Sequence, residues 1–197
     1  MITRTTTQLI QDLRDPANAE AWSGFDARYR PILHGFARRL GFSSDEASEI
    51  AQQTLVEFVR CYREGRYRRE DGRLSSWLIG IARNVAANAR RPRGAARVGG
   101  ESALVDLADE AALTRTWEEE RERSIFDQAI AILRSTSRAD AQTLRAFELF
   151  ALRAVPATEV ASQCGMSVDA VYVVKNRMTR RLREIVAQLT AAHAEDS

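Results

Sequence analysis

Two amphipathic helices joined by a basic loop dominate the pattern of apolar and polar positions in the first half of the chain. Over residues 43–64, apolar side chains recur every three to five positions, which predicts a helix with one buried face: Ala47, Ile50, Leu55, Phe58 and Cys61 or Tyr62. Its acidic first turns follow Ser43 and Ser44, either of which can act as the N-cap. A second stripe predicts a helix over residues 74–91: Leu74, Trp77, Leu78, Ile81 and Val85.

Helical spacing continues on both sides of this pair. A short helix around Leu9 is expected to end before Pro16, and a longer one over residues 22–40 to end at Gly41. Pro31 predicts a kink in the longer helix or the start of a new one. Residues 119–151 carry two more apolar stripes. The sequence therefore predicts an all-α fold.

The segment 155–186 has the pattern of a helix-turn-helix. A short helix meets Gly165, where a turn can take a positive φ, and Ser167 is placed to cap a second helix. That second helix buries an apolar stripe: Val171, Val174, Met178, Leu182 and Ile185. Its other faces carry polar and basic side chains suited to base edges and to phosphates.

A change of texture after Arg91 predicts two small helical domains joined by a flexible linker. Residues 93–120 are rich in glycine at first and then acidic and weakly periodic. We expect a first domain at 1–92, this acidic linker at 93–120, a helix-turn-helix domain at 121–190 and a tail at 191–197.

Composition limits the classes of function. The chain has 197 residues, of which 45% are hydrophobic and 28% charged, with a formal net charge of +2. It has no run long and apolar enough for a membrane span and no hydrophobic signal core, so we expect no membrane insertion. Two isolated cysteines do not indicate a disulfide framework, and a cytoplasmic location is the simplest expectation.

The sequence does not favour an enzyme. It shows no nucleophile paired with a base, no Cys/His spacing for a metal and no glycine loop for phosphates, so we expect no cofactor. Between Arg60 and Arg93, arginines far outnumber carboxylates. A charge run of this kind is more often a solvated face than a nucleic-acid site, and both interpretations stay open on charge alone.

Three motifs in one order resemble a known family. EASEIAQQTLVEFVRCYR is similar to an acidic core-binding helix, GRLSSWLIGIARNVAANARR to the motif S-W-L-x-x-I-A-R-N, and EVASQCGMSVDAVYVVKNRMTRRLRE to a C-terminal DNA-reading motif. The chain thus resembles the extracytoplasmic-function (ECF) type of sigma factor, in the sigma-70 family of bacterial RNA polymerase. The resemblance covers residues 21–91 and 124–189. Ser48 and Asn88 depart from it, since the family usually has acids there.

The resemblance implies three sets of contact residues. Core polymerase would be bound by an acidic and amide-rich set: Asp45, Glu46, Glu49, Gln52 and Gln53. The minus-ten promoter element would be bound by Arg66, Arg68, Arg69, Arg73, Arg83, Asn84, Asn88 and Arg91. The minus-thirty-five element would be read by Ser167, Asp169, Tyr172, Lys175, Asn176, Arg177, Arg180 and Arg181.

The implied partners are bacterial core RNA polymerase and promoter DNA, with an anti-sigma factor or a regulatory Ser/Thr kinase as further candidates. We hypothesise phosphorylation at Ser48 and Thr54, which would add negative charge beside the docking helix. Two other classes remain open. A stand-alone helix-turn-helix regulator would explain the C-terminal motif but not the acidic and arginine-rich pair, and a helical adaptor would leave both basic stretches without a role.

Overall fold

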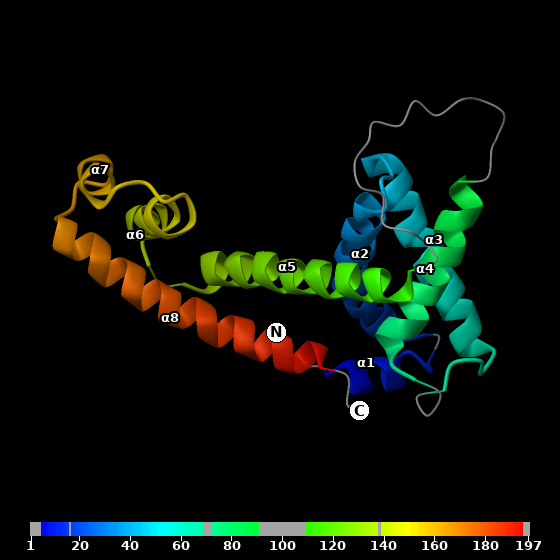
Figure 1. Ribbon diagram of the computed structural model, residues 1–197. Coiled ribbons are helices and arrows are strands. Elements are labelled where there is room, and N and C mark those ends of the chain that lie inside the picture. The colour runs from blue at the N-terminus through cyan, green and yellow to red at the C-terminus, as the bar shows by residue number, and fades with distance from the viewer. Residues whose placement is uncertain (1–4, 16, 69–71, 91–108, 138, 195–197) are drawn as a thin grey trace. The chain divides into compact units, whose positions relative to one another are not determined.

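The computed structural model describes residues 5–15, 17–68, 72–90, 109–137 and 139–194, and in these ranges the regular structure is helical (Figure 1). The fold class predicted from the sequence, all-α, is confirmed. The chain folds into two compact units, one from Thr3 to Ser124 and the other from Ile125 to His193. We call them the N-terminal and C-terminal units and describe each by itself.

The N-terminal unit is built on three long helices, α2 (Ala19–Arg39), α3 (Ser44–Arg63) and α4 (Leu74–Arg90), preceded by the short α1 (Thr6–Asp12). Helix α3 packs against both α2 and α4. Their facing sides bury Phe25, Phe36, Phe58 and Leu78 almost completely. Burial of large apolar side chains on one stripe of each helix is what holds the bundle together.

Aromatic rings connect the three helices through Phe58 of α3. Its ring centroid lies 4.9 Å from that of Phe25 on α2, in a stacked arrangement, and 5.9 Å from that of Tyr62. Tyr67, in the loop after α3, meets Phe58 edge-on at 5.8 Å and Trp77 of α4 edge-on at 5.5 Å. Offset and edge-to-face pairs of this kind add stability beyond the area that they bury. The row therefore joins the basic loop to the core.

Helix α2 runs as one helix through Pro31, so no new helix begins there. Proline cannot donate to the carbonyl four residues earlier, which belongs to Ala27. Both Pro31 and Ala27 are exposed, so water can satisfy that carbonyl. The helix ends as predicted at Gly41, whose φ of 90° is in the region that favours glycine.

The predicted linker differs from the structure in its second half. Residue 109 begins an ordered segment in which α5 (Glu110–Thr136) is capped by Asp109, which accepts from the backbone N–H of Ala112 at 2.9 Å. Leu113 and Trp117, one helical turn apart, are buried with the core of the N-terminal unit. From residue 109 on, the predicted linker is therefore not a flexible chain. The domain boundaries themselves remain predictions.

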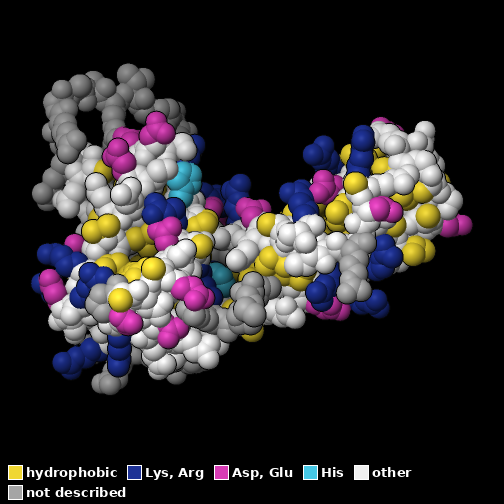
Figure 2. Space-filling model, turned by 180° about the vertical axis from the view of Figure 1, so that it is seen from behind, with side chains coloured by type: hydrophobic (Ala, Val, Ile, Leu, Met, Phe, Trp, Pro, Cys, Tyr) yellow, Lys and Arg dark blue, Asp and Glu magenta, His cyan; other side chains and the backbone are white. Residues whose placement is uncertain are grey.

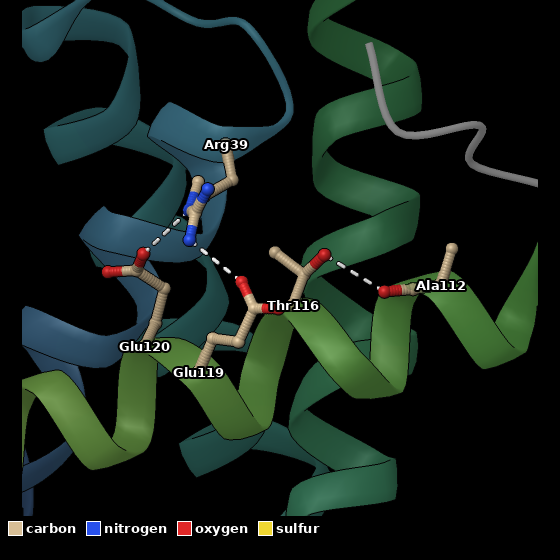
Figure 3. Close-up of polar contacts among 5 residues, drawn as sticks. All are labelled: Arg39, Ala112, Thr116, Glu119 and Glu120. Atoms are coloured by element: carbon tan, nitrogen blue, oxygen red, sulfur yellow. Dashed lines mark hydrogen bonds and ion pairs between the residues drawn. The ribbon is translucent and has the colours of Figure 1, made fainter. Parts of the chain in front are cut away.

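An ion pair fixes this part of α5 to α2 (Figure 3). The guanidinium of Arg39 donates to Glu120 at 3.0 Å through Nε and to Glu119 at 2.7 Å through Nη2. Glu120 has a side chain only 6% exposed, whereas the other two side chains are more than half exposed. The carboxylate of Glu120 lies over Gly35, where a Cβ would overlap it. A buried carboxylate needs such a partner, so Arg39 and the absence of a side chain at Gly35 make this packing feasible.

The C-terminal unit contains the end of α5, α6 (Ala141–Phe147), a π-helical turn η2 (Glu148–Leu152), α7 (Ala157–Gln163) and α8 (Val168–His193). Helix α8 packs against α6, α7 and η2. The apolar stripe predicted for α8 is buried as expected: Val171, Val174, Met178, Leu182 and Ile185. The unit thus forms its own core around one face of α8.

None of the helices in the described ranges has both the length and the apolar character that a bilayer-crossing segment requires.

Replacing Gly35 by alanine tests the packing of Glu120. We expect Gly35→Ala to lower the free energy of unfolding by about 1–3 kcal/mol, because the new methyl group displaces a buried carboxylate from Arg39. Urea unfolding followed by tryptophan fluorescence measures this change, since the chain's three tryptophans, Trp22, Trp77 and Trp117, all belong to the N-terminal unit.

Gly80→Ala in α4 is the matched control, because a Cβ at Gly80 meets no atom within 4 Å. It should leave stability unchanged or raise it by up to about 1 kcal/mol, as alanine favours helix over glycine. Adding Glu120→Ala to Gly35→Ala should recover part of the loss. Equal effects of the two glycine substitutions would refute the packing argument.

Candidate functional site

The N-terminus of α3 forms a capping box. Ser43 Oγ accepts from the backbone N–H of Glu46 at 3.3 Å, and the Glu46 carboxylate accepts from the backbone N–H of Ser43 at 2.9 Å. This confirms Ser43 as the N-cap. Glu46, which was predicted to contact polymerase, therefore caps its own helix. Asp45 and Glu49, from the same predicted set, are exposed.

A surface groove lies between α3 and α4, with a volume of about 800 Å³. Helix α3 contributes Glu49, Gln52, Gln53, Val56, Glu57 and Cys61, and α4 contributes Ile81, Asn84, Val85 and Asn88. The groove thus brings together residues from two predicted sets, one for polymerase and one for the minus-ten element. Its lining includes four carboxamides, two carboxylates and several apolar side chains, of which Val56 is 62% exposed. Carboxamides both donate and accept, so this groove suits a partner with hydrogen-bonding edges and some apolar surface.

Two titratable groups of the groove, the thiol of Cys61 and the carboxyl of Glu57, have shifted pKa values. Burial raises the pKa of the Cys61 thiol, and the neighbouring Glu57 carboxylate raises it further. Arg60 donates to Glu57 at 2.5 Å and lowers the pKa of that carboxyl. At neutral pH the thiol is therefore protonated and Glu57 is charged. The thiolate is the reactive form of cysteine, so the protonated thiol of Cys61 is not a nucleophile. Cys61 only lines the groove.

Residues 25–96 match the family model described as Sigma-70 region 2. The matched range includes most of α2 and the whole of α3 and α4, and the last two are the helices that line the groove. The N-terminal unit is thus similar to region 2 of the sigma-70 family.

The match supports a sigma factor role in transcription initiation by RNA polymerase. Region 2 of the sigma-70 family belongs to a non-enzymatic initiation factor that binds core polymerase and promoter DNA. The match supports the resemblance found in the sequence at the level of the sigma-70 family. No curated protein matches this chain.

The loop after α3 carries several of the arginines that were predicted to meet the minus-ten element. Arg66, Arg68 and Arg73 are exposed, and Arg66 pairs with Glu64 at 2.7 Å. Tyr67 between them is only 8% exposed and is held by the aromatic row. A buried ring thus anchors a loop whose cations face solvent.

The remaining predicted minus-ten residues have different surroundings. Arg83 is half-buried and lies 3.3 Å from the exposed carboxylate of Glu110 on α5, whereas Asn84 and Asn88 are exposed in the groove. Arg69 and Arg91 lie outside the described residues.

The two hypothetical phosphorylation sites differ in access. Ser48 is exposed, and its hydroxyl donates to the Ser44 carbonyl at 2.9 Å. Thr54 is fully buried, and its hydroxyl donates to the Ile50 carbonyl at 2.7 Å. The hypothesis for Thr54 is therefore wrong for this fold, because a kinase cannot reach the hydroxyl and a phosphate would not fit the core. Thr54 was placed beside the docking surface, yet it lies four residues from both Ile50 and Phe58 and so shares the buried face of α3.

In the C-terminal unit, α7 and α8 are joined by a tight turn. Gly165 has a φ of 57°, and Ser167 Oγ accepts from the backbone N–H of Ala170 at 3.1 Å, as predicted. Gln142 of α6 donates its side-chain amide to the Cys164 carbonyl and so ties the turn to the unit. The short connection fixes where α8 begins.

Helix α8 presents its predicted contact residues on two flanks. On one flank, a surface pocket of about 390 Å³ is lined by Arg177, Arg180 and Arg181 together with the end of α5. Arg181 pairs with Glu184 at 3.1 Å. On the other flank, Tyr172 and Lys175 contact Phe150 of η2. Ser167 and Asp169 are exposed at the start of the helix, and Asn176 is exposed about two turns further along.

Sequence reasoning missed two side chains that support these surfaces. Tyr67 stands between arginines in the loop, and an aromatic residue inside a basic run was the available signal for an anchor. Phe150 was assigned to an apolar stripe, and nothing local in the sequence indicated that its ring meets α8.

The capping role of Glu46 predicts that two neighbouring acids respond differently to substitution. We expect Glu46→Ala to lower the free energy of unfolding by about 0.5–2 kcal/mol, because it removes half of the capping box. Glu49→Ala should change stability by no more than about 0.5 kcal/mol, because that side chain is exposed. Urea unfolding of both variants makes the comparison, and an equal loss in both would count against the capping role.

Proposed function

We propose that this protein is an ECF-type sigma factor that docks on bacterial core RNA polymerase through α3 and recognises promoter DNA with both units. The observation that carries the proposal is the groove of region 2, because predicted contact residues for polymerase and for promoter DNA line its two walls. The α3 wall offers Glu49, Gln52 and Gln53 to polymerase. The α4 wall, with Asn84 and Asn88, lies beside it for the melted minus-ten strand.

Physical chemistry supports this division of roles. Capture of a single strand needs cations for phosphates and polar or aromatic groups for unstacked bases. The loop arginines 66, 68 and 73 supply the cations, and the carboxamides of α4 match base edges in hydrogen-bonding capacity. Acidic side chains on α3 repel phosphates, so they suit a protein partner better than a nucleic acid.

The C-terminal unit is proposed to read the minus-thirty-five element as a helix-turn-helix. Helix α8 begins at a fixed turn, and its exposed N-terminal side chains suit base edges in a major groove. The arginines of the pocket on its flank suit phosphates, which position the helix without reading sequence.

Co-purification with bacterial core RNA polymerase tests the docking surface. The full-length Gln52→Ala/Gln53→Ala variant should bind core polymerase at least tenfold more weakly than wild type, whereas the stability of the chain should not change, because both side chains are exposed. Glu46 is left intact so that the helix cap is preserved. Gln128→Ala/Gln188→Ala is the matched control, because these glutamines are exposed on helices of the other unit.

Two outcomes would change the conclusion. Wild type that binds a DNA duplex tightly but does not bind core polymerase would favour a stand-alone regulator. Equal loss of binding in the variant and in the glutamine control would reject the α3 wall as the docking surface.

The α4 wall is tested separately with Asn84→Ala/Asn88→Ala. This variant should bind core polymerase as wild type does but form open promoter complexes at least tenfold less, because its carboxamides contact DNA and not polymerase. Permanganate reactivity of unpaired thymines on promoter DNA measures opening. A loss of polymerase binding in this variant would assign the whole groove to polymerase.

A further inference from the structure

The ring of Phe150 contacts two of the side chains that α8 offers to DNA. Its centroid lies 5.3 Å from that of Tyr172, and the two planes meet at 88° in an edge-to-face arrangement. The ammonium nitrogen of Lys175 lies 5.5 Å from the same centroid. The half-buried ring of Phe150 thus contacts an aromatic and a cationic side chain that lie three residues apart on α8.

The backbone around Phe150 explains how the ring reaches α8. Helix α6 continues into the π-helical turn η2, which ends where Arg153 donates its backbone N–H to Glu148 and Val155 donates to Leu149. Because a π turn holds more residues than an α turn, it rotates the side chains that follow relative to those of α6. Phe147 of α6 is buried in the core, whereas Phe150 lies at its edge, against α8.

Both contacted side chains are exposed, so they would otherwise sample several rotamers. Tyr172 is 48% exposed, and Lys175 is exposed on the same side of the helix. An edge-to-face pair and a cation over an aromatic face are each attractive and directional. Holding a contact residue in its bound orientation before binding reduces the entropy lost on binding.

We propose that Phe150 is a positioning residue for DNA recognition by α8, which holds Tyr172 and Lys175 in the orientation that discriminates between sequences. The inference rests on the proposed reading of promoter DNA by this unit. It separates the two flanks of α8 by role: the Phe150 flank contributes to selectivity, and the flank of Arg177, Arg180 and Arg181 contributes affinity that does not depend on sequence.

A protein partner is the competing occupant of this surface, because exposed apolar side chains lie close in sequence to the same contacts. Leu152 is 39% exposed and Val173 is 63% exposed, and Figure 2 shows hydrophobic side chains among the basic side chains of the C-terminal unit. The observations favour DNA. Lys175 contacts the ring of Phe150, and the next residue, Asn176, is also exposed, so this stretch of α8 offers a cation and a carboxamide, two groups that can bind base edges.

The test compares full-length wild type, Phe150→Leu and Phe150→Tyr, each assembled with bacterial core polymerase. Leucine keeps an apolar side chain but removes the ring, whereas tyrosine keeps the ring. Wild type first selects preferred duplexes from a random-sequence DNA library. The affinity of each protein for a selected duplex and for its scrambled version then gives a selectivity ratio.

Phe150→Leu should lower the selectivity ratio about three- to tenfold, with the affinity for scrambled duplex and its salt dependence unchanged. Phe150→Tyr should keep the ratio of wild type. In a Tyr172→Ala/Lys175→Ala background, Phe150→Leu should have no further effect on the ratio, even if it lowers the stability of the unit.

Several results would overturn the inference. Equal losses on selected and scrambled duplex would show a structural role only, as would an additional effect in the double-alanine background. Intact selectivity with weaker capture of polymerase would assign the surface to a protein. Wild type that selects no sequence would reject the proposed promoter reading together with this inference, whereas wild-type selectivity that Phe150→Leu retains would reject this inference alone.

Discussion

Stacking of aromatic rings around Phe58 is the interaction on which the N-terminal unit depends. Phe58 meets Phe25 of α2, Tyr62 of its own helix and Tyr67 of the following loop, and Tyr67 in turn meets Trp77 of α4. These buried contacts therefore determine how α3 and α4 pack against each other and where the basic loop starts. The positions of the groove and of the loop arginines, which are surface features, thus depend on the packing of Phe58, Tyr67 and Trp77.

Much of this arrangement can be predicted from local sequence. Apolar spacing predicts α3, α4 and α8 because each helix buries one continuous stripe, and the caps at Ser43 and Ser167 act within their own first turns. The glycine at 165 was predictable for the same reason, since its positive φ is a local requirement. Features that depend only on residues close in the sequence could thus be predicted from the sequence alone.

The features that could not be predicted depend on contacts between distant residues. The first half of α5 has an acidic and weakly periodic sequence, and it is ordered because Leu113 and Trp117 enter a core made by other helices and because Glu120 meets Arg39, far away in the chain. The contact of Phe150 with α8 is of the same kind. In the candidate site, residue types indicated the partners, but the shared groove of α3 and α4 appeared only when the helices were packed.

The amine of Lys175 gives the C-terminal unit a chemical property that its arginines do not share. Lys175 is the single lysine of the chain, and it lies over the ring of Phe150 on α8. Apart from the chain terminus, every reaction specific for primary amines is therefore directed to one position. Acetylation there would remove one positive charge and the cation that faces the ring, while all the guanidinium groups kept theirs. A modification common to many proteins would thus act in this chain as a change at a single residue of α8.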